Sequence, residues 1–413
     1  MSTTSLPSYV APSFTRTPTY TAEPQAYEQR LALNRTQARP SGNFIKSSKT
    51  GGVSLRLSAQ DSEAELPTYG CGASVEGTVD LSKTDGISFV EVKIEGSLKL
   101  KEIAEGGTNT HKLCLTRMTL WSRDRNTGSC PSSLPFSLAL PTTFTDGKDQ
   151  YPLPPTYESK ALLPIKNLNS VTTSFTYYPR SRPAVPIPSP MIITSSLPGV
   201  IDSPEWKCFE SIMPSKQRGG QDILSKLYIP ASRVFCINEA IPFHLIFSSS
   251  AHSLVSYLPY APVTSSFTSS RQHTKIQILR QSSVDVRNTL IMGTKTDIWR
   301  VVSIGEGIFR HASDGPEFIS FVGEIRVNQQ IKIGGFKAGG LFIKDCIVLS
   351  MSPPDPVKTP FGELRNVIPI RLTTDPWSDD GSGPFAPSEY SVPSTPEDAA
   401  HSGNPFADYR ETD

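Results

Sequence analysis

Two long blocks of this chain alternate apolar and polar residues with a period of two, and this pattern limits the fold more than any other feature. Such alternation is typical of β-strands that bury one face. Turn residues separate the alternating segments, and no long amphipathic helix interrupts them. We therefore predict an all-β fold of two antiparallel, immunoglobulin-like β-sandwiches. The clearest alternation occurs at Val53, Leu55 and Leu57 in the first block, and at Ile241, Phe243, Leu245 and Phe247 in the second.

The alternation and the distribution of proline divide the 413 residues into five parts. Both ends are rich in Ser, Thr and Pro without a sustained period, which predicts disorder. A proline-rich stretch between the two blocks predicts a semi-rigid connector. The predicted parts are a disordered tail at 1–48, a first sandwich at 49–183, a connector at 184–222, a second sandwich at 223–373 and a disordered tail at 374–413.

Composition argues against several classes of function. The chain has 40 basic and 39 acidic residues, so no bulk attraction to nucleic acid is expected. No apolar run approaches the roughly 20 residues of a membrane span, and no signal peptide is evident. The six cysteines are scattered and the six histidines are isolated. We therefore expect a cytoplasmic protein with reduced thiols, with no cofactor or metal and without enzymatic activity.

A PPxY motif, Pro154-Pro155-Thr156-Tyr157, is the sharpest short motif in the chain. Two prolines favour the polyproline II backbone that WW domains bind, and the tyrosine adds a rigid anchor. The alternative is that the prolines only shape a connection between strands. Degenerate copies occur at 6–9, with Pro7 and Tyr9, and at 66–69.

The C-terminal tail carries two tripeptides that resemble endocytic ligands. Asp375-Pro376-Trp377 resembles the DPW peptide that clathrin-adaptor appendage domains bind, and Asn404-Pro405-Phe406 is the NPF peptide that EH domains bind. Asn-Pro favours a tight turn that presents the phenylalanine. The alternative is that both tripeptides are coincidental in a proline-rich tail.

Short blocks spread over residues 50–373 resemble fungal arrestin-like proteins of the α-arrestin type. The blocks of the first half are YGCG at 69–72, VEGTV at 75–79, VKIEGSLKL at 92–100 and YPRSRP at 178–183. Those of the second half are YIP at 228–230, IPFHL at 241–245, IGEG at 304–307 and KDCIVL at 344–349.

The resemblance implies an arrestin-like fold with N-terminal and C-terminal sandwiches. It also implies a non-catalytic trafficking adaptor that links membrane transporters or receptors, as cargo, to a WW-domain HECT-type ubiquitin ligase, to EH-domain or clathrin-adaptor proteins, or to both. Such a protein would be peripheral at the plasma membrane or endosomes. The alternative hypothesis is a β-sandwich scaffold that binds a soluble signalling partner without recruiting a ligase.

The first block departs from the family pattern after the PPxY motif. Only 19 residues, 158–176, separate Tyr157 from Tyr177, where the resemblance implies two long strands. We count about six strands in this block against seven in a full sandwich. Three explanations remain open: another segment fills the gap, the chain is a shortened isoform, or the gene model skips an exon.

Overall fold

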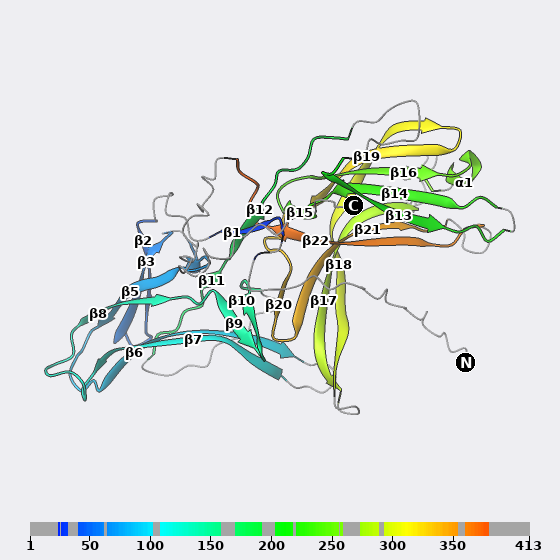
Figure 1. Ribbon diagram of the computed structural model, residues 1–413. Helices are drawn as coiled ribbons and strands as arrows, with labels where there is room; N and C mark the ends of the chain where they lie inside the picture. The colour runs from blue at the N-terminus through cyan, green and yellow to red at the C-terminus, as the bar shows by residue number, and fades with distance from the viewer. Residues whose placement is uncertain are drawn as a thin grey trace, which may run out of the picture.

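The computed structural model shows an all-β protein with two lobes, which confirms the predicted fold class (Figure 1). The described residues form 22 strands and one short helix, α1 (Ala251–Val255). All but two of the strand pairings are antiparallel. The structure describes residues 24, 26–31, 40–61, 64–101, 108–157, 170–191, 203–217, 220–255, 257–258, 273–288, 293–353 and 360–379.

The N-terminal lobe is built from small sheets. A four-stranded sheet has the order β2-β3-β5-β8, and β6 pairs only with β7 among the described strands. The four-stranded sheet contains β2 (Gly42–Ser47), β3 (Val53–Gln60), β5 (Ser74–Leu81) and β8 (Ser133–Ala139). The facing ribbon contains β6 (Phe89–Lys101) and β7 (Thr108–Ser122), and a short hairpin contains β9 (Thr143–Asp146) and β10 (Asp149–Pro152).

Two short strand pairs connect distant parts of the chain beside this lobe. β4 (Thr68–Tyr69) pairs in parallel with β11 (Thr176–Tyr177). β1 (Glu28–Leu31) pairs antiparallel with β12 (Arg180–Pro183). The segment that leaves the N-terminal lobe, β12, is therefore hydrogen-bonded to β1, an early segment of the same chain.

The C-terminal lobe contains a single hydrogen-bonded sheet of ten strands. In chain order these are β13 (Trp206–Met213), β14 (Ile223–Pro230), β15 (Val234–Cys236), β16 (Ile241–Ser248), β17 (Thr274–Asn288), β18 (Gly293–Gly315), β19 (Phe318–Val327), β20 (Phe336–Ala338), β21 (Leu341–Met351) and β22 (Leu364–Thr373). The short parallel pair β15–β22 ends the sheet on one side, and β13 ends it on the other.

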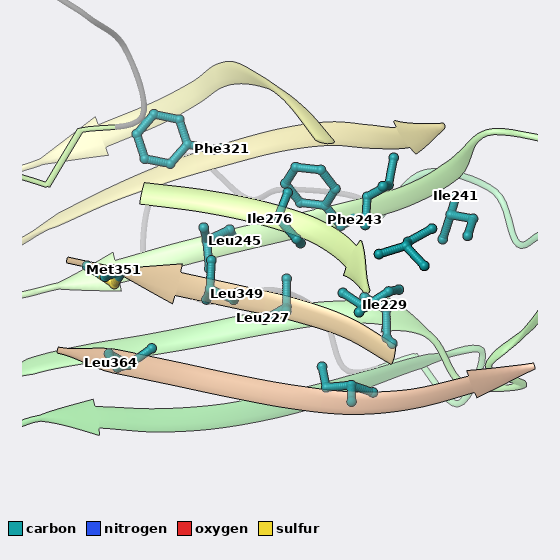
Figure 2. Packing of buried hydrophobic residues seen from close by; sticks show 14 of the residues in the cluster. Leu227, Ile229, Ile241, Phe243, Leu245, Ile276, Phe321, Leu349, Met351 and Leu364 are labelled. Carbon is teal, nitrogen blue, oxygen red and sulfur yellow. The ribbon is translucent and has the colours of Figure 1, made fainter. Parts of the chain in front are cut away.

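This sheet closes over its own core (Figure 2). Leu227 in β14 and Leu245 in β16 pack in one cluster with Leu349 in β21 and Leu364 in β22, although these pairs of strands are not neighbours in the sheet. Strand alternation places these side chains on one face, so folding the sheet over removes them from water. The result is the sandwich-like packing that the second block of alternation predicts.

The tip of a C-terminal-lobe hairpin lies in the core of the N-terminal lobe. We call residues 336–343, which contain β20 and the start of β21, the inserted hairpin. Its turn is Gly339-Gly340, with φ of +49° and +83°, a backbone that suits a tight two-residue turn. Alternation along the hairpin points four side chains into the N-terminal core, namely Phe336, Ala338, Leu341 and Ile343.

The structure also extends the folded part beyond the boundaries expected from sequence. β1 and β2 lie within the predicted tail at 1–48, and β13 lies within the predicted connector at 184–222. Residues 374 and 375, expected in the second tail, donate backbone N–H bonds to Ser181 O at 3.1 and 2.9 Å. Long-range pairing explains β1, which pairs with β12, and residues 374 and 375, which bond to Ser181. β2 and β13 instead form hairpins with the next strands, β3 and β14.

Candidate functional site

The PPxY motif, residues 154–157, leaves the short β9–β10 hairpin at the junction of the lobes. The residue before it, Leu153, is buried and donates its backbone N–H to Thr142 O at 2.9 Å. Pro154 and Pro155 are half-buried, whereas Thr156 and Tyr157 are exposed. The motif therefore begins inside the fold and ends at the surface.

Thr156 ties the motif to β11. Its backbone N–H donates to Tyr177 O at 2.9 Å, and its side-chain Oγ1 accepts from Tyr177 N at 2.8 Å. β11 in turn pairs with β4, where Tyr69 is buried. The degenerate copy at 66–69 thus has its tyrosine in the core, where no partner domain can reach it.

The Tyr157 ring lies against the inserted hairpin. It meets Phe336 edge to face, with ring centroids 5.4 Å apart and an interplanar angle of 69°. The Tyr157 side chain still exposes 39% of its surface, so it is neither free nor fully buried. An edge-to-face aromatic pair contributes about 0.5–1.5 kcal/mol beyond its buried area.

Polar contacts hold the same hairpin to the N-terminal lobe. Lys337 Nζ donates to Tyr151 Oη at 2.6 Å and lies 4.2 Å from the centre of that ring. Tyr178 Oη donates to Lys332 O, just before the hairpin, at 3.0 Å. A Cβ added at Gly339 would lie 2.9 Å from the His111 ring, so the turn touches β7 closely.

Asp375 of the DPW-like peptide forms a bidentate ion pair with Arg180 of β12. Arg180 Nε lies 3.1 and 3.0 Å from the two carboxylate oxygens, and Arg180 Nη2 also donates to Oδ1. The hydrogen bond to Asp375 raises the pKa of Arg180. Trp377 is half-buried and Pro376 is exposed. The Asp375 carboxylate of this peptide therefore already forms an ion pair within the protein.

A second ion pair joins the first and the last described strands, β1 and β22. Glu28 in β1 accepts from Arg371 in β22, with Oε1 at 3.2 Å from Nε and 3.1 Å from Nη2. Sequence reasoning did not identify this pair or the Arg180–Asp375 pair. The partners lie 343 and 195 residues apart, and no local pattern connects them.

The structure brings two of the predicted peptides, 154–157 and 375–377, to the junction of the lobes. Thr156 bonds to Tyr177, and Arg180, three residues after Tyr177, holds Asp375. Pro7, Tyr9, Asn404, Pro405 and Phe406 lie outside the described residues.

Metal-ligating groups and cysteine thiols are the other candidate sites for chemistry in the part of the chain that the structure describes. It contains no group of three or more His, Cys, Asp or Glu side chains that could hold a metal ion. All six cysteines are free thiols, and burial raises the pKa of Cys236 to about 11 and that of Cys346 to about 12. Within the described residues, no helix has the length and apolar character to cross a bilayer.

Comparison with known proteins gives one kind of match. No protein-family model matches the chain, and no curated protein sequence matches it. Among solved structures it is similar to squid arrestin, with a TM-score of 0.34 and 9% sequence identity, over 82% of this chain and 99% of that chain.

Proposed function

We propose that this chain is a non-catalytic, arrestin-like adaptor of the α-arrestin type, the group that its sequence blocks resemble. In this proposal residues 154–157 bind a WW domain of a HECT-type ubiquitin ligase, and the β-sandwich lobes carry the membrane cargo. The supporting observation is that Tyr157 is 39% exposed and follows the half-buried pair Pro154-Pro155. A cytoplasmic location, peripheral at plasma membrane or endosomes, follows from the proposal.

The ligase proposal is tested by titrating the purified chain into a WW domain of a HECT ligase. Tyr157→Ala and Pro155→Ala each remove a contact that the groove requires, so each is expected to weaken binding by at least tenfold. Tyr9→Ala in the degenerate copy is expected to weaken binding less, because that copy has lost one proline. The matched control is Phe89→Ala, another exposed aromatic residue, 51% exposed, outside all the peptides.

The endocytic part of the proposal concerns 375–377 and 404–406. Because Arg180 already holds Asp375, the first peptide is expected to bind appendage domains more weakly than a free DPW peptide. Phe406→Ala is expected to abolish EH-domain capture, and Trp377→Ala to reduce appendage-domain capture. Retention of both kinds of protein by the double variant would reject these two peptides as the endocytic ligands, and no capture by the wild-type chain would reject the endocytic role.

The alternative function is a scaffold that binds a soluble signalling partner without a ligase. The observation that favours it is that Thr156 and Asp375 both make contacts within the fold. The WW titration separates the two, since a scaffold of this kind would show no binding that depends on Tyr157.

A further inference from the structure

Tyr157 of the PPxY motif contacts Phe336 of the inserted hairpin, and this contact suggests how access to the motif is regulated. Tyr157 belongs to the N-terminal lobe and Phe336 to the C-terminal lobe, yet their rings pack edge to face at 5.4 Å. A WW groove that encloses the tyrosine must take it from Phe336. The two contacts are therefore alternatives for the same ring.

The hairpin is held at its base by a buried ion pair, and at its tip by four side chains in the N-terminal core and by polar contacts. At the base, the buried Arg280 guanidinium contacts the Asp345 carboxylate at 2.8 and 3.0 Å and donates to Ile333 O at 2.7 Å. On the N-terminal lobe, the polar attachments are Lys337 to Tyr151 and Tyr178 to Lys332. The hairpin therefore belongs to the C-terminal lobe and is docked onto the other lobe.

We propose that the docked hairpin restrains the PPxY motif, so that WW-domain binding and hairpin docking compete. This proposal rests on the proposed function of residues 154–157. When the hairpin is docked, the tyrosine ring faces Phe336 and the motif is held; when the hairpin is displaced, the ring is free for the groove. The apparent affinity then falls in proportion to the fraction of molecules that are competent to bind. The position of the C-terminal lobe thereby sets how strongly the ligase is recruited.

The test compares a free peptide spanning residues 150–161 with the full chain, using the same WW domain. The wild-type chain is expected to bind more weakly than the peptide. Phe336→Ala removes the ring contact and is expected to raise the affinity of the full chain about three- to tenfold. Lys337→Met removes the hydrogen bond to Tyr151 without touching Tyr157, and is expected to raise it about fivefold. Ile308→Ala, at a 57% exposed site on β18, is the matched control and is expected to change nothing.

The outcomes separate this proposal from the one on which it rests. If the free peptide does not bind, the ligase function itself fails, and the competition fails with it. If the peptide and the wild-type chain bind equally, the ligase function stands and the restraint is rejected. If the chain binds more weakly but Lys337→Met stays at the wild-type level, the hairpin is not the restraining element. Because Lys337 is half-buried and outside the apolar core, its variant decides the question even if Phe336→Ala does not fold.

Discussion

The cores of the two lobes differ in how completely they exclude water. In the C-terminal lobe, many core side chains have no exposed surface; among them are Met213, Ile223, Leu227, Ile241, Leu245, Ile278 and Leu349. Among the described residues of the cluster that forms the N-terminal core, only Ala338 and Ile343 reach 0% exposure. Both of these residues come from the C-terminal lobe, through the inserted hairpin. The most completely buried side chains in the N-terminal core are therefore supplied by the C-terminal lobe.

The difference follows from the number of strands in each lobe. Ten strands allow the C-terminal sheet to cover both sides of its core, whereas the ribbon β6–β7 covers the N-terminal core with two. Inward-facing residues of that ribbon, such as Val92 and Leu98, are consequently only partly buried. The lesson is that apolar side chains from a distant part of the chain, the inserted hairpin, complete part of the N-terminal core. The three explanations for the short segment at 158–176 are not tested, because residues 158–169 lie outside the described residues.

The largest effect is expected from breaking the ion pair at the base of the inserted hairpin. Asp345→Ala leaves the Arg280 guanidinium buried without its carboxylate, which costs about 3–5 kcal/mol. Because β21 serves both cores, hydrogen exchange is expected to rise in both lobes. The double variant Arg280→Met with Asp345→Leu is expected to recover most of the loss. Faster exchange confined to the C-terminal lobe would show that the lobes are energetically independent.

Matched leucines in the two cores test the difference in closure directly. Leu245→Ala in the closed core is expected to cost about 3–4 kcal/mol, because the cavity has little freedom to collapse. Leu138→Ala, at a 6% exposed site in the N-terminal core, is expected to cost about 2 kcal/mol. Denaturant unfolding of both variants, followed by hydrogen exchange, gives the two values. Equal losses would contradict the idea that the N-terminal core is the looser one.

Acidification is expected to affect the C-terminal lobe through His244. This residue is buried in β16, and neither ring nitrogen has a hydrogen-bond partner among the described residues. Burial lowers the pKa of His244 from 6.5 to about 4. The unfolded chain therefore binds a proton more readily, so stability is full above pH 6.5 and falls between pH 6.5 and 4, by up to about 3 kcal/mol.

His244→Leu is expected to remove this slope from the unfolding free energy of the C-terminal lobe. The measurement is denaturant unfolding at intervals from pH 4 to 7.5, beside the wild-type chain. The slope of the N-terminal lobe serves as the internal control. An unchanged slope in the variant would assign the acid sensitivity to carboxylates instead.

The smallest effect is expected at surface ion pairs, and it should not distinguish the lobes. Arg56–Asp80 lies on the N-terminal lobe, and Lys226–Glu210 on the C-terminal lobe, with at least 30% of each side chain exposed. Such pairs contribute about 0–1 kcal/mol. Arg56→Ala and Lys226→Ala are each expected to change the unfolding free energy by less than about 1 kcal/mol, and less still in high salt. A larger loss in one lobe would reveal a network beyond the pair.

The sequence predicted the fold class and the best-alternating strands, because period-two burial is a local signal. Pairing lengthens some strands well beyond such clear alternation: β17 runs from Thr274 to Asn288, and β18 from Gly293 to Gly315. The added parts of the two strands pair with each other, and Val284 of β17 packs against the N-terminal core. β13 (Trp206–Met213) was placed in the connector because the connector was predicted from the proline-rich stretch between the two blocks.

The candidate site was only half predictable. Local chemistry identifies the PPxY motif, but the ring that meets Tyr157 comes from residue 336. Asp375 was recognised as part of a short tripeptide, whereas its partner, Arg180, lies 195 residues away. Contacts of this kind depend on the relative placement of the two lobes. No local pattern in a single sequence indicates that placement.

The late position of the inserted hairpin has a consequence for synthesis on the ribosome. The N-terminal lobe ends at about residue 183, but Ile343, which completes its core, follows 343 − 183 = 160 residues later. At about 5–20 residues per second, this interval lasts roughly 10–30 seconds. During that time the nascent lobe exposes the apolar surface that the hairpin later covers. A chain stalled before residue 336 is therefore expected to need chaperone protection that the finished protein does not.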